Sequence, residues 1–222
     1  IAVRATSSTS NGYQTVDRFR SDIDGVSTTF TQSRQDLSSS DTGPYEVGLR
    51  NYKRIALAGA GTAAAGGYVE ATAYRVEAQD LASSGWNYTS SSSNLSLQFW
   101  FRCSTNQTFY AAIRTDDTTT RMFSFSFTAS GNNTWTKITK VIPGNSGITI
   151  NNDTGIGMSI FIIPYYGTNF TANGTALDTW RTYDSAAHFP DMASTWLTAG
   201  ASTFDFTGFQ LEVGDSPTDF IL

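Results

Sequence analysis

The sequence has few residues that could staple a domain or bind a metal ion. It contains one cysteine, Cys103, and one histidine, His188, among 222 residues. A single cysteine excludes an intramolecular disulfide, and any histidine-based triad or metal cluster would have to use His188. A chain of this length does not need a staple, because it can bury roughly 70% of the surface that it exposes when unfolded.

Charge is also scarce, at 15% of the chain compared with about 25% in typical domains. Fourteen basic residues are scattered among nineteen acidic ones, for a formal net charge of −5. Binding to nucleic acid requires clustered lysine and arginine, so we expect no nucleic-acid partner. The most apolar stretch, 156–166, is shorter than the ~20 residues of a membrane span, so we expect no span.

Serine, threonine, asparagine and glycine are abundant where other proteins have charged residues, and aromatic residues make up 14% of the chain. This composition is typical of an extracellular type of β protein, with a hydroxyl-rich surface and an aromatic core. Side chains that alternate between two faces, as strands produce, recur along the chain. We expect strands at 12–19, 26–32, 45–57, 68–81, 95–103, 108–114, 121–128, 135–142, 157–163 and 204–213.

The segment 204–213 is the most informative of these. With a period of two, Phe209 and Leu211 face the side opposite to Phe204 and Phe206. Gly208 lies between these pairs, where it marks a bulge or a close approach of a neighbour. In another segment, 45–57, the same alternation turns Val47, Leu49 and Ile55 inward.

Many short strands separated by turn clusters predict an all-β fold, an antiparallel β-sandwich of the jelly-roll type. We expect residues 1–11 to be an N-terminal arm or connection, and residues 12–222 to form a single jelly-roll domain. A long loop at about 164–203 shows no alternation. Loops of this length are usually functional or locally structured.

The long loop is the best candidate for a binding site, because ligand pockets combine aromatic faces with a few polar groups. The expected carbohydrate-binding residues are Tyr165, Tyr166, Trp180, Arg181, Tyr183, Asp184 and Trp196. The alternative is that these rings bury the loop onto the sandwich or in a subunit interface. Aromatic side chains dominate core packing as much as binding sites, and packing is their more common role.

No catalytic set can be assigned, and we expect no enzyme activity. His188 has Asp184 and Asp191 nearby in the sequence, but no Gly-x-Ser-x-Gly elbow accompanies it, so a packing or surface role is favoured. Cys103 follows the apolar phase of its strand, as a buried thiol does. Paired carboxylates could hydrolyse glycosides, but the sequence does not pair its candidates: Asp178, Asp184, Asp191, Glu46, Glu70 and Glu77.

Calcium is the one ion that the sequence leaves open, and we otherwise expect no cofactor or metal. Asp116 and Asp117, and the segment 151–153, cluster the oxygen ligands that calcium uses. Neither cluster matches an EF-hand loop, and asparagine and aspartate are also the preferred residues of turns.

Five motifs occur in an order that resembles a family of tailed-bacteriophage virion proteins, notably tail-fibre, appendage and decoration proteins of marine and environmental phages. They are YQTVDRF at 13–19 (like Y-x-V-D-R-W), LSLQFWFR at 95–102 (like L-S-F-W-V-K), WTK at 135–137 (like W-E-K), IPG at 142–144 (like I-P-G-D) and FTGFQLEVG at 206–214 (like I-T-G-V-Q-L-E-V-G). The resemblance covers about residues 13–220. Family members usually continue into a basic, tyrosine-containing tail, whereas this sequence ends at Leu222.

The resemblance implies a jelly roll like that of carbohydrate-binding modules, placed on the exterior surface of a virion. It also implies other virion proteins as partners, a homo-oligomer such as a trimer, and contact with a host-surface glycan. It supplies no catalytic residues. We therefore expect a virion structural protein, either a tail fibre or a capsid fibre or decoration. The alternatives are a stand-alone carbohydrate-binding module and a glycan-degrading enzyme.

Overall fold

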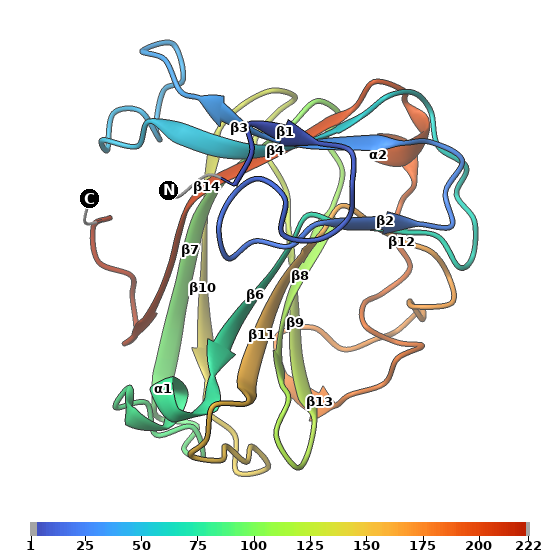
Figure 1. Ribbon diagram of the computed structural model, residues 1–222. Helices are drawn as coiled ribbons and strands as arrows, with labels where there is room; N and C mark the ends of the chain where they lie inside the picture. Colours follow the sequence, from blue (N-terminus) through green and yellow to red (C-terminus); the bar gives the residue numbers. More distant parts are fainter. Residues whose placement is uncertain (1–3, 221–222) are drawn as a thin grey trace.

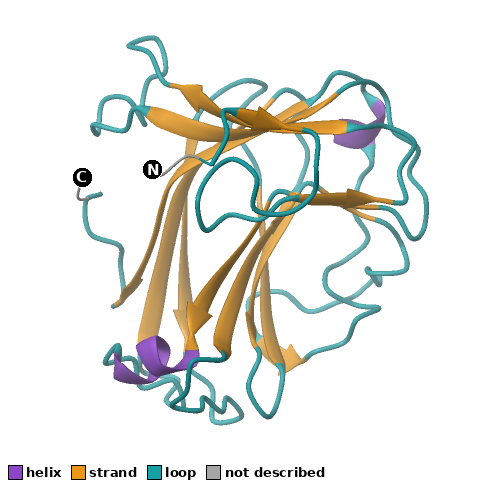
Figure 2. Cartoon of the chain, in the orientation of Figure 1, coloured by secondary structure: helices purple, strands orange, loops and turns teal. Residues whose placement is uncertain are grey.

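The computed structural model describes residues 4–220 and shows two large antiparallel sheets packed face to face (Figures 1 and 2). The six-stranded sheet has the order β1 (Ser7–Ser8), β3 (Phe30–Asp36), β4 (Asn51–Leu57), β14 (Thr203–Val213), β7 (Asn94–Cys103) and β10 (Thr136–Pro143). The five-stranded sheet has the order β13 (Trp180–Thr182), β9 (Arg121–Phe127), β8 (Phe109–Thr115), β11 (Ile156–Ile163) and β6 (Thr72–Glu77).

A small third sheet and two short helices complete the described elements. The small sheet has the order β12 (Tyr165–Tyr166), β5 (Tyr68–Glu70) and β2 (Asp22–Asp24), and it lies beside the five-stranded sheet in Figure 1. The helices are α1 (Ala78–Ser83) and α2 (Thr195–Thr198). This architecture confirms the predicted all-β, antiparallel sandwich of the jelly-roll type.

Strands β7 to β11 and β14 begin and end within one residue of the predicted segments. The N-terminal third differs. No strand forms at 12–19, where Gly12 and Arg18 adopt positive φ angles of 98° and 67°, and the segment predicted at 26–32 becomes a strand only at Phe30. Left-handed backbone interrupts alternation, which a pattern of side chains alone does not reveal.

Two other predicted strands are shorter than their patterns. The segment 45–57 is a turn until β4 begins at Asn51, and the prediction that Val47 faces inward is wrong, since 44% of this residue is exposed. Gly43 and Gly48 have positive φ angles of 94° and 90°, which bend the chain there. The segment 68–81 divides into β5, β6 and helix α1, while the long loop contains β12, β13 and α2.

The core between the two large sheets is predominantly aromatic. The ring of Phe101 lies 4.7 Å from Phe204, 5.0 Å from Phe127 and 5.4 Å from Phe109, measured between centroids. Such close, tilted pairs stabilise beyond the area that they bury. Cys103 is fully buried beside them, as predicted, and burial raises the pKa of its thiol to about 12.

The strand β14 lies inside the six-stranded sheet, between β4 and β7, and has a bulge at Gly208. Its pairing with β7 shifts between Thr207 and Gln210, and Gly208 has a φ angle of 61°. A bulge adds one residue to a strand and reverses the phase of the side chains beyond it. Phe209 and Leu211 therefore pack against the same core as Phe204 and Phe206. The prediction of opposite faces is wrong, whereas the bulge at Gly208 is confirmed.

Asp205 is completely buried on the other side of β14. It lies in register between Arg54 of β4 and Arg102 of β7. Arg54 donates to both of its oxygens at 2.8 Å, and Arg102 Nε donates to Oδ2 at 3.1 Å. Because a buried carboxylate is tolerated only when it is paired, this row of three charges fixes the register of the central strands.

Substitution of Gly208 by alanine tests the bulge. A Cβ atom there would lie 2.8 Å from Leu49 Cδ1 and 3.2 Å from Trp100 Cδ1, in a backbone conformation that costs about 1–3 kcal/mol for other residues. We expect Gly208→Ala to lower the free energy of unfolding by at least that amount in urea denaturation. Gly85→Ala is the control, because its φ angle is 86° but no atom lies within 4 Å of its Cβ. Equal losses in both variants would contradict close packing at the bulge.

Candidate functional site

A groove crosses the outer face of the five-stranded sheet, with walls from the small sheet and the long loop. We call it the outer groove. Its main hollow has a volume of about 290 Å³, and an adjoining hollow of about 200 Å³ adds Met122, Tyr183 and Phe189. The main hollow is lined by Arg20, Asp22, Tyr68, Glu70, Arg75, Arg114, Phe161, Tyr166, Phe170 and His188.

One row of paired residues runs beneath the outer groove, and three of its members, Arg75, Arg114 and Met122, line the two hollows. The row crosses all five strands in register, and consists of Arg75, Ser159, Arg114, Met122 and Arg181. The strands place these side chains outward because the residues beside them, such as Ile113 and Ile160, are buried in the core. Alternation in each strand thus aligns three arginines across one face of the sheet.

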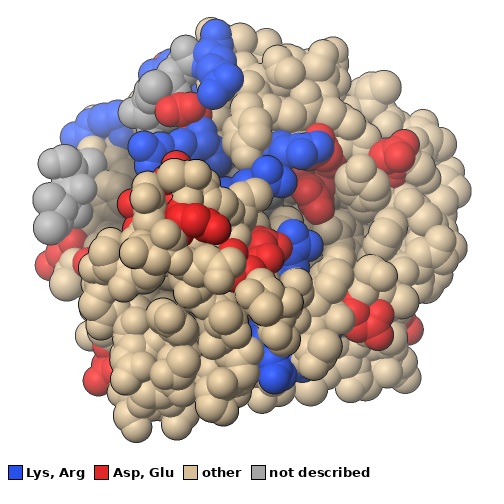
Figure 3. All heavy atoms as spheres, turned by 60° about the horizontal axis from the view of Figure 1, so that its bottom comes forward, with Lys and Arg blue, Asp and Glu red and all other residues tan. Residues whose placement is uncertain are grey.

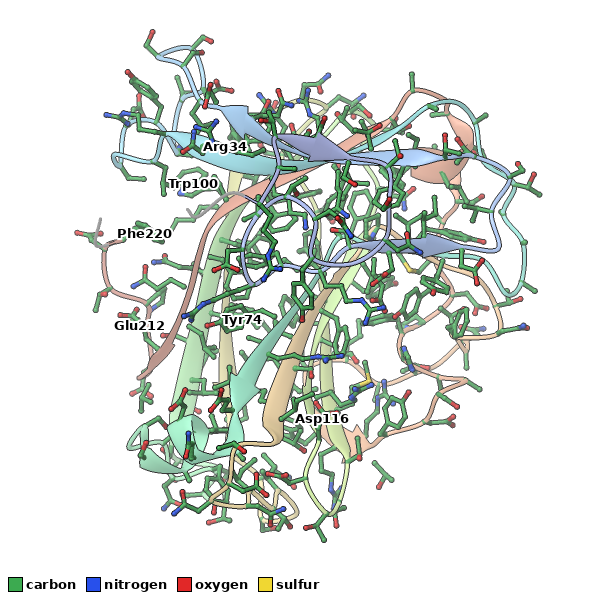
Figure 4. The ribbon with its side chains drawn as sticks, in the orientation of Figure 1. Arg34, Tyr74, Trp100, Asp116, Glu212 and Phe220 are labelled. Carbon is green, nitrogen blue, oxygen red and sulfur yellow. The ribbon has the colours of Figure 1, made fainter. Side chains whose placement is uncertain are left out.

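Arg114 is held in place at the centre of this row. Its Nε donates to Asp116 Oδ1 at 2.7 Å, and Ser159 Oγ donates to Asp116 Oδ2 at 2.6 Å. The guanidinium lies 5.0 Å from the ring centroid of Phe161 and 5.1 Å from that of Tyr183. Asp116 lies near the end of the sheet in Figure 4. The terminal nitrogens of Arg114 form no hydrogen bond with residues 4–220, so they are available to a ligand.

Two acidic side chains stand in the wall. Glu70 of β5 and Asp22 of β2 are direct partners across the small sheet. The hydroxyl of Tyr166 donates to Glu70, and burial raises the pKa of both groups. Asp22 is paired with Arg20, whose Nη2 donates to Oδ1 at 3.2 Å. Burial therefore raises the pKa of Glu70 although the Tyr166 hydroxyl opposes this, and Arg20 balances the charge of Asp22.

His188 lies among aromatic rings at the end of the outer groove. Its ring centroid is 5.3 Å from those of Tyr166 and Tyr183, and its Nε2 lies 3.2 Å from the Tyr183 hydroxyl. Burial, together with the positive charges of Arg114 and Arg181, lowers the pKa of His188 to about 4. The imidazole is neutral at pH 7 and contributes no charge to the groove.

The structure does not bring the seven predicted carbohydrate-binding residues together. Tyr166 and Tyr183 line the outer groove. Arg181 does not line it, but is paired with Met122 in the row and donates to Ser124 Oγ at 3.2 Å. Asp184 is exposed, and its Oδ1 accepts a hydrogen bond from Ala186 N at 2.9 Å.

Tyr165, Trp180 and Trp196 instead pack into the core between the sheets. Trp196 is fully buried, and its Nε1 donates to the Thr203 carbonyl at 2.9 Å. Trp180 Nε1 donates to the Pro143 carbonyl at 2.6 Å. For these three rings, the packing alternative is the one that the structure shows, so they present no open face to a ligand.

The sequence-based search missed Arg20, Asp22, Arg75 and Arg114 as members of a site. Arg75 and Arg114 occupy polar positions in segments that were predicted as strands. These positions were the one sign in the sequence that both side chains face outward. The pairing order of the strands is needed to show that these positions are neighbours, and it is not encoded in any one segment.

The side chains considered for calcium are engaged within the protein. Asp117 Oδ2 accepts from Asn151 N at 2.9 Å, and Oδ1 accepts from Asn151 Nδ2 at 3.3 Å. Within residues 4–220, no three side chains of histidine, cysteine, aspartate or glutamate form a metal-binding group. In the same range, no helix is both long and apolar enough to span a membrane.

No protein-family model and no curated protein matches the sequence. Solved structures align with the fold at low identity. They include the family 11 carbohydrate-binding module of a cellulosomal cellulase of Clostridium thermocellum, with a TM-score of 0.43, 12% identity and 96% of each chain covered. The enzymatically active domain of tailspike protein 4 of bacteriophage CBA120 aligns with a TM-score of 0.44 and 9% identity, over 89% of this chain and 20% of that one. These values are too low to bear on function.

Titration of His188 tests the electrostatics of the outer groove. Since the sequence has one histidine, its imidazole NMR signals are assigned without ambiguity. We expect a midpoint at about pH 4 in the folded chain and near the ordinary value of 6.5 in urea. Between these pH values the unfolded chain binds more protons, so stability falls as the pH is lowered through this window.

Arg114→Gln should raise the midpoint of the folded chain, because it removes a positive charge that disfavours the imidazolium. A midpoint near 6.5 in the folded chain would contradict the buried, electropositive surroundings of His188.

Proposed function

We propose that this chain is a non-enzymatic structural protein on the exterior of a phage virion, and that its outer groove binds a glycan of the host surface. The five ordered sequence motifs support the virion role, either as a tail fibre or as a capsid fibre or decoration. The face in Figure 3 is mostly uncharged, with acidic and basic side chains interspersed across it. Such a surface suits a protein that is displayed in solvent.

The combination of ring faces and arginines in the outer groove carries the glycan proposal. Tyr68, Phe161 and Phe170 are partly exposed there and present apolar faces, onto which the C–H face of a sugar can pack. Arg75 and Arg114 supply N–H donors that fit hydroxyl and carboxylate oxygens. A few polar groups among apolar walls are the usual composition of a ligand site.

The charge balance favours an acidic glycan. Arg75 is exposed and forms no ion pair with the described part of the chain, and Arg114 keeps its terminal nitrogens free of hydrogen bonds there. His188 is neutral at pH 7, and burial raises the pKa of Glu70. The carboxylate of a uronate or another acidic sugar could therefore accept hydrogen bonds from both terminal nitrogens of Arg114.

Arg75→Gln tests this binding without disturbing a structural contact. We expect binding to acidic polysaccharide on an array of host glycans to weaken about tenfold, because a hydrogen bond between charged groups is worth roughly 1.5–3 kcal/mol. Lys137→Gln is the matched control, since Lys137 is an exposed cation on β10 of the other sheet. An equal effect of both variants, or no binding to any host glycan, would refute the role of the groove.

The position on the virion is tested by immunogold labelling of purified particles. We expect label on the exterior of the particle. Label on the tail would indicate a tail fibre, and label on the capsid would indicate a capsid fibre or decoration. Particles without label would contradict the virion proposal and favour a stand-alone carbohydrate-binding module. Light scattering of the purified chain tests the associated proposal of a homo-oligomer, such as a trimer.

Glycan hydrolysis is the second candidate, because the outer groove places Glu70 beside Asp22, an acid that was not among the candidates from the sequence. Glu70 and Asp22 are opposite one another across β5 and β2, and the raised pKa of Glu70 is a property of general acids. Release of reducing ends from a bound polysaccharide, abolished by Glu70→Gln, would establish an enzyme. A binding protein releases none.

A further inference from the structure

A second cavity, separate from the outer groove, opens beside the six-stranded sheet where β4 and β14 diverge. Its volume is about 420 Å³, within the range of ligand pockets. The pairing of β14 with β4 ends at Phe206, opposite Lys53, just before the bulge at Gly208. We call this space the Lys53 cavity. Its apolar walls are formed by Val16, Phe19, Leu49, Phe206, Phe209 and Phe220.

The loop after β1 closes one side of the Lys53 cavity. In Figure 1 this loop crosses the side of the sandwich between β14 and β6, and it contributes Val16 and Phe19 to the walls. Phe220 lies on the segment after β14 and contributes a further ring (Figure 4). The loop after β1, the residues just before β4 and the segment 206–220 thus bring apolar side chains to one space. Lys53 is the buried cation in it.

Lys53 is 2% exposed and has few partners for its charge. Its Nζ donates to the carbonyl oxygen of Phe19 at 2.8 Å, which is its one hydrogen bond among the side chains and backbone that the structure describes. An ammonium group has three donors, and leaving buried donors without acceptors is costly. The remaining donors of the protonated amine are therefore available to a ligand oxygen.

Neighbouring charges do not satisfy this group. Asp22 favours the charged form of Lys53 at long range, but its carboxylate is bonded to Arg20. On adjacent β3, the partner of Lys53 is Arg34, which is paired with Asp36. Arg50 also lines the cavity, and its guanidinium donates to the carbonyl oxygens of Tyr45 and Leu49.

We propose that the Lys53 cavity binds a small apolar carboxylate, such as a medium-chain fatty acid, with its carboxylate on the Lys53 ammonium. The buried ammonium of Lys53 complements the single negative charge of such a ligand, and the aromatic walls of the cavity complement its apolar chain. A carboxylate oxygen can accept the donors that Phe19 leaves unused. The ligand would be held by burial of its apolar part, and its orientation would be set by the charge pair.

The protonation of Lys53 makes the proposal testable without a variant. Burial lowers the pKa of this amine to about 7, so the cation is present below that pH and is lost above it. Isothermal titration with decanoate should show binding about tenfold weaker or more at about pH 9 than at about pH 6. Decanol, which has the same chain and no charge, should bind equally at both pH values. Decanoate binding that does not change with pH would overturn the proposal, as would its absence at either pH.

Lys53→Met supplies the second test. We expect it to weaken decanoate binding at about pH 6 by about tenfold or more and to leave decanol binding unchanged, whereas Lys137→Met should change neither. The variant should fold, because methionine fits an apolar wall without a charge to desolvate. Decanoate affinity equal to that of the parent chain would refute the pairing with Lys53.

The unfolding of the same variant reports whether the amine is buried. The folded pKa of about 7 lies below the ordinary 10.5, so the unfolded chain binds more protons at Lys53, and stability rises with pH from about 7 to about 9. Above that, the buried Cys103 thiol, with its pKa raised from 9.0 to about 12, opposes this rise. Lys53→Met should remove this rise. A parent chain whose stability does not rise there would contradict the buried ammonium on which the proposal depends.

Discussion

The bulge at Gly208 is the constraint on which the sandwich depends. The strand β14 runs through the interior of the six-stranded sheet, so both of its halves must present aromatic side chains to one core. Phe206 and Phe209 do so only because an extra residue at a left-handed position reverses the phase between them. At the same place β4 leaves β14, and the space that opens becomes the Lys53 cavity. One backbone position therefore links the core, the order of the sheet and a buried cavity.

The outer groove shows how burial changes the meaning of a charged residue. Counted from the sequence, the chain is acidic, yet three arginines and two acids line the main hollow of the groove. Asp22 and Asp116 are each bonded to an arginine, and burial raises the pKa of Glu70. Arg75 and the terminal nitrogens of Arg114 remain available. A net charge thus describes the surface as a whole and says little about one hollow in it.

Much of the fold could be predicted because alternation is a local property. Strands β7 to β11 carry long, regular patterns, and their positions follow from them. The N-terminal third could not be predicted in the same way. Its alternation at 12–19 is interrupted by the positive φ angle of Arg18, a conformation that contacts with the rest of the chain stabilise and that the residue itself disfavours. The candidate site was predicted in part, since Tyr166 and Tyr183 line the groove and Trp196 does not.

The sequence by itself determined an antiparallel sandwich with an aromatic core, a buried Cys103 and a bulge at Gly208, because composition, period and glycine act over a few neighbouring residues. The tertiary structure alone decided which rings are buried and which line a groove. Trp196 and Tyr166 lie in the same loop, but one is covered by both sheets and the other borders open space. The physical reason is that an aromatic side chain gains as much from packing in a core as from lining a site. Only the pairing of distant strands settles which neighbours surround it.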